Sequence, residues 1–303
     1  MTDNSASKLR DRLAQGRIVV MPGIYDSLSA VLAQKAGAEA LYLSGASIAY
    51  TQLGRPDVGL VSMAEVAQLL TLIADRVDIP ILVDADNGYG NALNVQRTVR
   101  LFERAGAAAI QLEDQTLPKR CGHLGGKSLI STTEMVGKIK AALDARASDQ
   151  TLIVARTDAV GVEGLDRALD RADAYAEAGA DVLFIEAIGS DADMRTVTTR
   201  YAGRVPLLVN IVEGGATPLL PASTLETLGF SIVIFPGGAV RAVSRALDDY
   251  YSSLMTHGTN APFLPRMNDL RGINGIVGTE DLLALGKRYD PDIQPAFTGE
   301  TKQ

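Results

Sequence analysis

The chain has 303 residues, is 47% hydrophobic and carries 29 Lys+Arg against 36 Asp+Glu, for a net charge of −7. Its basic residues form no cluster, which argues against nucleic acid as a partner. Its apolar runs are shorter than the ~18 residues that span a bilayer, and the polar N-terminus lacks an apolar signal core. The single cysteine excludes an internal disulfide and fits a reducing compartment, so we expect a cytoplasmic protein without a membrane partner.

Eight short apolar runs recur along the chain, and most are continuous rather than alternating. This pattern is typical of parallel strands that are buried on both faces. The runs are 17–23, 40–45, 81–86, 108–114, 152–158, 182–187, 207–213 and 231–237. Between them, helical periodicity occurs at 61–77, 94–107, 132–147, 165–180 and 239–255. Ser62 with Glu65, and Ser131 with Glu134, match the capping box that begins a helix.

Strands that alternate with helices predict an α/β fold, specifically a (β/α)8 TIM-type barrel. A doubly wound sheet is the alternative, but eight regular units without a glycine-rich nucleotide loop favour the barrel. The sequence contains no segment that resembles a linker. We therefore expect one barrel domain over residues 1–303, with a C-terminal helical extension at about 239–303.

Polar residues stand where the predicted strands end, and in a TIM-type barrel these ends form the active site. They are Ser44, Asp84, Asp86, Glu113, Asp114, Arg156, Asp158, Glu186, Asn210 and Glu213. Asp84 and Asp86 are two apart on a strand and face the same way, and with Glu113 they offer the oxygen ligands that suit Mg²⁺. A structural network that pairs these acids with Arg156 and Lys119 is the alternative.

Arg156 itself has two interpretations. A guanidinium at a barrel mouth is a natural fork for a substrate carboxylate. The alternative is a buried salt bridge with Glu186 or Asp158.

The segment 114–131, which we call the flap, lacks regular periodicity and is long for a connection. Pro118 and several glycines give it a stiff entry and a flexible middle, as a lid requires. It carries Cys121 and His123. A zinc site is disfavoured because the chain has no other cysteine and His257 is distant in sequence. A Cys/His nucleophile pair and a mobile loop with an incidental cysteine both remain open.

The pairing of DADNGYG at 84–90 with KRCGH at 119–123 resembles the isocitrate lyase/phosphoenolpyruvate mutase superfamily. The chain is most similar to its short carbon–carbon lyases, of the 2-methylisocitrate and 2,3-dimethylmalate types, over roughly residues 10–290. Further similar segments are LYLSGAS with Asp57 in the following loop, ARTDA, FIEA and NIVEGGATPL.

This resemblance implies a (β/α)8 barrel whose last helix is swapped onto a neighbouring subunit, within a homotetramer that is a dimer of dimers. It implies Mg²⁺, or alternatively Mn²⁺, as the cofactor. The implied metal residues are Asp57, Asp84, Asp86 and Glu113. The implied residues for a small carboxylate substrate are Ser44, Gly45, Ala46, Gly122, Arg156, Glu186 and Asn210. The implied gating and catalytic residues are Lys119, Arg120, Cys121 and His123, with Cys121 as the acid.

The resemblance also implies a retro-aldol reaction. A 2-hydroxy di- or tricarboxylate of the 2-methylisocitrate kind would yield pyruvate or glyoxylate plus a carboxylate such as succinate, with Cys121 protonating the departing carbanion. Val212, and the Gly-Gly pairs at 214–215 and 125–126, depart from the lyase pattern and leave fewer donors for a third carboxylate. The alternatives are 2,3-dimethylmalate lyase, oxaloacetate hydrolase or decarboxylase, a phosphoenolpyruvate or carboxyphosphonoenolpyruvate phosphonomutase, and a non-catalytic carboxylate-binding barrel.

Overall fold

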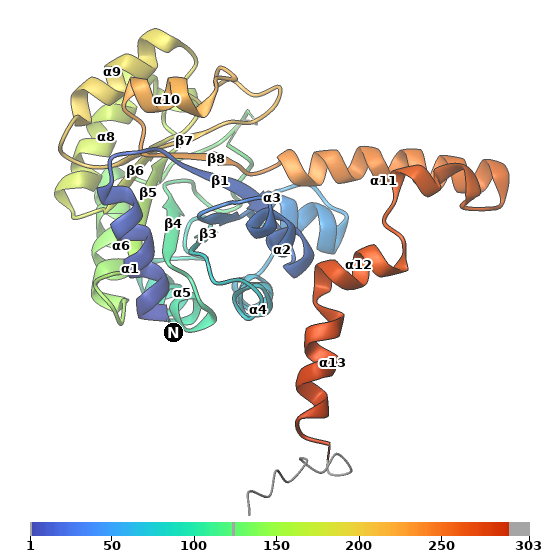
Figure 1. The fold of residues 1–303 in the computed structure, drawn as a ribbon. Helices are drawn as coiled ribbons and strands as arrows, with labels where there is room; N and C mark the ends of the chain where they lie inside the picture. The colour runs from blue at the N-terminus through green and yellow to red at the C-terminus, as the bar shows by residue number, and fades with distance from the viewer. Residues whose placement is uncertain (1, 123–124, 291–303) are drawn as a thin grey trace, which may run out of the picture. The chain divides into compact units, whose positions relative to one another are not determined.

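The computed structural model describes residues 2–122 and 125–290, and its eight strands form a closed barrel in which every neighbouring pair is parallel. β8 closes the barrel against β1, with Val19 opposite Ile232. The strands are β1 Val19–Ile24, β2 Leu41–Leu43, β3 Ile81–Asp84, β4 Ala109–Glu113, β5 Leu152–Thr157, β6 Val182–Ile185, β7 Leu207–Asn210 and β8 Ile232–Phe235. Figure 1 places helices around this barrel. The predicted (β/α)8 fold is confirmed.

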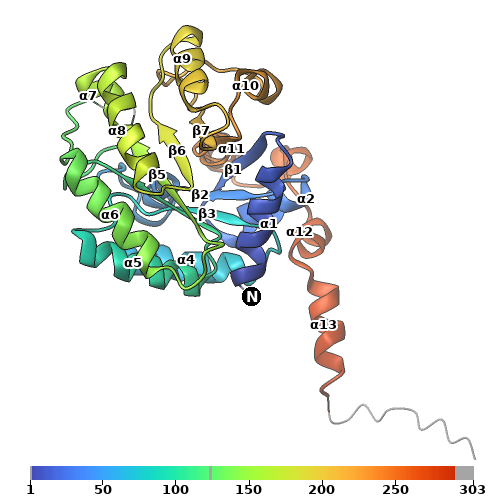
Figure 2. The same cartoon turned by 90° about the vertical axis from the view of Figure 1, so that its left-hand side faces the viewer.

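The five predicted helices all form, and further helices occur before, between and after them. The helices up to β5 are α1 Thr2–Ala14, α2 Ser27–Lys35, α3 Gly45–Ile48, the π-helix η1 Ala49–Leu53, α4 Met63–Ala74, α5 Ala92–Ala105 and α6 Thr132–Ala145. After β5 come α7 Val160–Glu163, α8 Leu165–Glu177, α9 Asp191–Tyr201 and α10 Ala222–Leu228. The last are α11 Gly238–His257, the 3₁₀-helix η2 Ala261–Arg266, α12 Leu270–Val277 and α13 Thr279–Lys287. Figure 2 shows α5, α6 and α8 side by side outside the strands.

The two predicted capping boxes differ. Ser62 and Glu65 exchange both bonds at the start of α4, so this box is confirmed. At α6, the Ser131 side chain accepts a hydrogen bond from the Glu134 amide. That bond alone makes Ser131 an ordinary N-cap, which still satisfies one of the unpaired amides of the first turn.

Alternate residues of each strand face the barrel interior, and the others pack under the surrounding helices. The interior cluster includes Met21, Tyr42, Leu82, Ala109, Val154, Phe184, Leu208 and Ile234. Two residues of α1, Ala6 and Leu9, are fully buried in the same cluster. This helix was not predicted from the sequence because its apolar residues are few, although they help to fill the barrel interior. The polar pocket described below therefore rests on a packed apolar core rather than on a channel.

The chain divides into two compact units, Met1–Arg245 and Ala246–Gln303. The first contains the barrel. The second is helical, and its buried Phe263 packs against Tyr250 at 5.4 Å between ring centroids. Many of its large apolar residues are exposed, including Tyr251, Met255, Leu264, Leu270, Leu282, Leu283 and Tyr289. Within the described part of the chain, no helix is both long and apolar enough to cross a membrane.

Candidate active site

A pocket lies at the carboxyl ends of the strands, where the polar strand-end residues predicted it. Most of the predicted residues line it: Ser44, Ala46, Asp57, Asp84, Glu113, Lys119, Arg120, Cys121, Gly122, Arg156, Glu186 and Asn210. Its volume is only about 60 Å³. The flap residues Lys119, Arg120, Cys121 and Gly122 form part of its lining, so the flap lies against the pocket in this structure.

The acids of β3 and β4 are buried beneath the flap. Asp84, Asp86 and Glu113 are each less than a tenth exposed. Burial raises the pKa of Glu113 well above its usual range, and it raises the pKa of Asp86 to about 7 although Lys119 opposes the shift. Asp86 also takes a left-handed backbone conformation, with φ of 48°, at the tight turn that follows β3. Buried acids of this kind are stabilised by a nearby cation.

In this structure the cation among the acids is Lys119. Its Nζ lies 2.5 Å from Asp57 Oδ1 and 2.7 Å from Asp86 Oδ1. Burial by itself lowers the pKa of Lys119, but the surrounding carboxylates, Asp86 foremost, hold it well above its usual range. The acid–lysine network that the sequence left as an alternative is therefore present.

The same acids fit a hard divalent cation. Within residues 2–122 and 125–290, no three His, Cys, Asp or Glu side chains converge closely enough to form a complete metal cage. However, Glu113 Oε1 is buried without a hydrogen-bond partner in the described structure. Gly45 lies close to Asp84, because a Cβ at this position would be only 3.1 Å from Asp84 Oδ2, so no side chain of residue 45 covers this carboxylate oxygen. A few oxygen ligands supplemented by water suit Mg²⁺.

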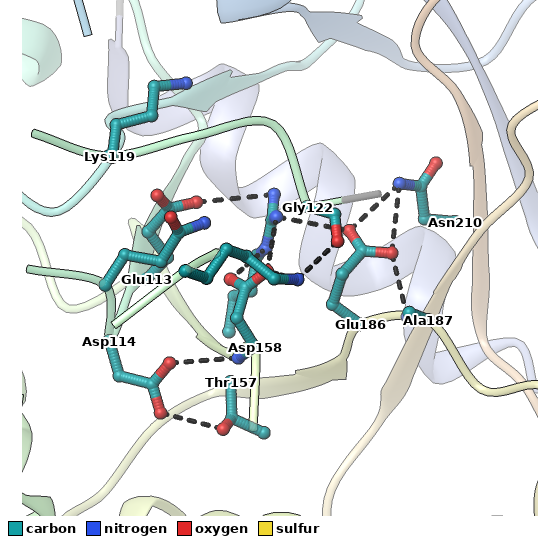
Figure 3. Close-up of polar contacts among 12 residues, drawn as sticks. Glu113, Asp114, Lys119, Gly122, Thr157, Asp158, Glu186, Ala187 and Asn210 are labelled. Carbon is teal, nitrogen blue, oxygen red and sulfur yellow. Dashed lines mark hydrogen bonds and ion pairs between the residues drawn. The ribbon is translucent and has the colours of Figure 1, made fainter. Parts of the chain in front are cut away.

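Arg156 adopts the salt-bridge arrangement in this state. Its Nε and Nη2 donate to both oxygens of Asp158 at 3.0 Å, and its guanidinium nitrogens lie 3.4 Å from Glu113 and from Glu186. Figure 3 shows these contacts around Asp158 and Glu186. The guanidinium also stacks over the Phe184 ring at 5.1 Å. Arg156 also lines the pocket. Its role as a fork for a substrate carboxylate stays a prediction.

Asp114, which the sequence marks as a strand-end acid, supports β5 from behind the pocket. It accepts hydrogen bonds from the Asp158 amide at 2.9 Å, the Thr157 hydroxyl at 2.7 Å and the Tyr175 hydroxyl at 2.8 Å. Burial raises the pKa of Asp114. This acid therefore fixes the backbone that carries Asp158.

The flap is held by hydrogen bonds within the segment itself and by bonds to Asp158 and to the loop that carries Asp57. The side chain of Gln115 bonds both the amide and the carbonyl of Arg120, at 2.9 Å each. Lys127 donates to the Gly122 carbonyl and, at 2.9 Å, to Asp158. The Cys121 amide donates to the Asp57 carbonyl at 3.2 Å. These bonds hold Cys121 against the pocket.

The close fit of the flap is clearest at Gly122. A Cβ at this position would lie 2.2 Å from Arg156 Nη2 and 2.8 Å from Glu186 Cγ. Only a glycine allows the flap backbone to come this close. His123, a site residue predicted from the sequence, lies outside the described residues.

The remaining predicted residues flank the acids. Ser44 caps α3 by accepting from the Ser47 amide at 3.2 Å, which places Gly45 beside Asp84. On the other side, Asn210 Nδ2 donates to Glu186 Oε2 at 3.1 Å, and Asn210 Oδ1 is buried without a hydrogen-bond partner in the described structure.

Other residues of the site were not identified from the sequence. Tyr50, Pro236, Gly237 and Arg241 line the pocket, as does Tyr42 from the barrel interior. Gln111 and Lys127 support the site without lining it. The sequence could have indicated Gln111, because it is a polar residue in the middle of an otherwise apolar strand.

The chain matches the family model described as phosphoenolpyruvate phosphomutase over residues 9–255. It belongs to this family. It is 41% identical to 2,3-dimethylmalate lyase of Eubacterium barkeri over 94% of this chain and 98% of the relative. It is 46% identical to 2-methylisocitrate lyase of Aeropyrum pernix over 90% and 87% of the two chains.

A solved structure of phosphonopyruvate hydrolase in complex with oxalate and Mg²⁺ has a TM-score of 0.85 and 32% identity, covering 95% of this chain and 99% of that chain. The resemblance that the motifs indicated is thus confirmed. The similarity to lyases over nearly the whole length identifies the chain as a carbon–carbon lyase, as predicted.

Proposed function

We propose that this lyase is Mg²⁺-dependent and cleaves the C2–C3 bond of a 2-hydroxy acid that carries a second carboxylate, releasing an α-keto acid such as pyruvate or glyoxylate. The observation that carries the proposal is a group of buried acids directly beneath a flap that bears a thiol. Glu113 keeps a buried oxygen without a hydrogen-bond partner in the described structure, and Cys121 lines the same pocket.

The residues that would hold the ion are Asp57, Asp84, Asp86 and Glu113, several of them through water. A bound Mg²⁺ would stabilise the negative charge that develops on the 2-oxygen of the substrate. Mn²⁺ would suit the same oxygen ligands. The Mg²⁺ and oxalate in the similar phosphonopyruvate hydrolase support this assignment, because oxalate resembles the carboxylate end of an α-keto acid.

The other predicted residues would orient the substrate. Ser44, Gly45 and Ala46 would hold its C1 carboxylate through the backbone, and Arg156 would donate to the 2-oxygen region. Gly122, Glu186 and Asn210, at the other side of the pocket, would contact the other end of the substrate. Because Arg156 is already surrounded by acids, it stays charged and its fork is preorganised.

The chemical step breaks the C2–C3 bond and moves two protons. A general base accepts the proton of the 2-hydroxyl, the O–H electron pair forms the C2=O bond of the keto acid, and the electrons of the C2–C3 bond remain on C3 as a carbanion next to the second carboxylate. The Cys121 thiol then gives its proton to C3. The flap, with Lys119 and Arg120 lining the pocket, would exclude water from the carbanion.

Within this substrate class, the pocket favours a branched dicarboxylate over a tricarboxylate. Val212 and Pro236 form an apolar part of its lining. Arg241 also lines it but is already paired with Glu213. A third carboxylate would need a further cation, whereas alkyl groups of the 2,3-dimethylmalate kind would contact Val212 favourably.

A substrate panel tests the proposal. The purified protein is incubated at fixed Mg²⁺ with 2,3-dimethylmalate, 2-methylisocitrate, isocitrate, oxaloacetate and phosphonopyruvate, and keto-acid formation is followed with and without EDTA. We expect EDTA-sensitive cleavage of 2,3-dimethylmalate above that of either tricarboxylate. Turnover of phosphonopyruvate alone would contradict the lyase mechanism, and turnover that EDTA leaves intact would contradict the metal site.

We also propose that the lyase is a cytoplasmic homotetramer in which the C-terminal helix is swapped onto a neighbouring subunit. The exposed apolar residues of the second unit, such as Leu270, Leu282 and Leu283, support burial against another subunit. Light scattering coupled to size-exclusion chromatography checks this, and a monomeric mass at micromolar concentration would contradict it.

A further inference from the structure

A chain of hydrogen bonds runs through the barrel interior to one of the pocket acids. The Tyr42 hydroxyl lies 3.0 Å from Gln111 Oε1, and Gln111 Nε2 lies 3.1 Å from Asp84 Oδ1. All three side chains are more than nine-tenths buried. They come from β2, β3 and β4, and Asp84 and Gln111 are partners in the register of β3 and β4. Three adjacent strands therefore hold this series of hydrogen bonds in place below the pocket.

The chemistry of the groups sets the direction of each bond. A carboxylate can only accept, so Gln111 must present its amide N–H to Asp84. Its carbonyl oxygen then faces Tyr42, whose hydroxyl must donate. Burial, followed by the charge of Asp84, raises the pKa of Tyr42 well above its usual range, which keeps the hydroxyl proton in place. Tyr42 thereby prevents the Gln111 amide from turning over.

The two oxygens of Asp84 consequently have different surroundings. Oδ1 accepts from Gln111 Nε2 and from the Asp86 amide, at 3.1 Å each. Oδ2 is directed toward Gly45, where a Cβ would lie only 3.1 Å away. The carboxylate is thus held at one oxygen, and the other oxygen is left on the side of the pocket.

We propose that Gln111 is a positioning residue that fixes the Asp84 carboxylate so that Oδ2 is the oxygen presented to a divalent cation, with Tyr42 locking the Gln111 amide. This inference rests on the proposed metal site. The competing explanation is that Gln111 merely fills the barrel interior and satisfies Tyr42. The two explanations predict different metal affinities when the amide donor is removed. A positioning role predicts a loss of affinity of about 10–100-fold, which is typical of partners that orient a metal ligand, whereas simple filling of the interior predicts no loss.

The test uses Gln111→Met, which keeps the length of the side chain but removes its donor, and Tyr42→Phe, which removes only the hydroxyl. The control is Thr151→Val, which removes a buried hydroxyl that donates to Glu103 at 2.7 Å, away from the pocket. Binding of Mn²⁺ to each full-length protein is measured from the electron paramagnetic resonance signal of the free ion. Thermal melts of the same samples report the loss of stability.

We expect Gln111→Met to weaken Mn²⁺ binding about 10–100-fold, Tyr42→Phe to weaken it by less, and Thr151→Val to leave it unchanged despite a lower Tm. At saturating Mn²⁺, kcat of Gln111→Met should return toward the wild-type value. The apparent KM of the variant for the metal should stay higher than that of wild type. If wild type binds Mn²⁺ and both site variants bind it equally well, the positioning role is wrong while the proposed function stands. If Gln111→Met does not fold, unchanged binding in Tyr42→Phe equally rules out the positioning role. If wild type binds no Mn²⁺, the proposed metal site fails as well.

Discussion

A flap residue, Lys119, places its Nζ 2.5 Å from Oδ1 of Asp57, one of the acids that we propose for metal binding. The same nitrogen lies 2.7 Å from Asp86. The flap thus brings a positive charge into the acid cluster. Lys119 and a bound divalent cation would therefore compensate the same negative charges.

Replacing Lys119 by Met should destabilise the metal-free protein, because loss of one partner of a buried ion pair costs about 3–5 kcal/mol. Mg²⁺ should then raise the Tm of the variant more than it raises that of wild type, since the ion supplies the missing charge. Melts with EDTA and with Mg²⁺ measure the difference. Lys8→Met, at an exposed lysine, is the control. Equal Mg²⁺ effects in wild type and variant would refute the shared compensation.

The raised pKa of Asp86 predicts a pH dependence of stability. Its pKa is about 7 in the folded protein, mainly because of burial, against an ordinary value of 3.8. The folded state therefore binds the proton more tightly than the unfolded state, and the Asp86 contribution makes the protein less stable as pH rises from about 4 to about 7. Urea unfolding of the metal-free protein across this range should give a flatter pH dependence for Asp86→Asn than for wild type. An unchanged slope would rule out this contribution.

Cys121→Ser should lower kcat by about 10²–10⁴-fold, because a hydroxyl is a far weaker acid than a thiol and the acid role is worth about that much. The loss should appear in kcat rather than in metal affinity, because the thiol is not a proposed ligand. Steady-state kinetics together with Mn²⁺ titration separate the two effects. Undiminished release of keto acid would disprove the proton-donor role.

Gly122→Ala should keep the flap from seating, since the added methyl would overlap Arg156 Nη2 at 2.2 Å. We expect a large loss of kcat and faster reaction of Cys121 with a thiol reagent, with little change in Tm. Gly125→Ala is the matched control on the same flap, because a Cβ there meets no heavy atom within 4 Å. Similar thiol reactivity in both variants would contradict the seated arrangement.

Val212→Thr should shift specificity toward a tricarboxylate. The added hydroxyl supplies one donor in the apolar part of the pocket, and one hydrogen bond contributes about 1 kcal/mol. The ratio of kcat/KM for 2-methylisocitrate over 2,3-dimethylmalate should rise by about fivefold. A ratio that stays constant would mean that Val212 does not contact the group that distinguishes the two substrates.

The sequence was informative where one local rule governs the structure. Continuous apolar runs located all eight strands, although the run at 207–213 continues three residues beyond β7, which ends at Asn210. The acids at strand ends reached a common pocket because parallel strands in a barrel end on one side.

What the sequence could not provide were contacts between distant segments. Lys127 reaches Asp158 across 31 residues, and Tyr42 reaches Gln111 across 69. No periodicity encodes such pairs. The choice of Arg156 between substrate and protein acids was equally undetermined, because it depends on where Asp158 lies in space.

Asp158 is shared by two cations with different tasks, since it binds Arg156 in the barrel and Lys127 on the flap. Lys127 in turn donates to the carbonyl of Gly122, next to the thiol. A ligand that draws the Arg156 guanidinium away from Asp158 would leave the Asp158 charge to Lys127. Engagement of Arg156 is thereby coupled electrostatically to the flap segment that carries Cys121.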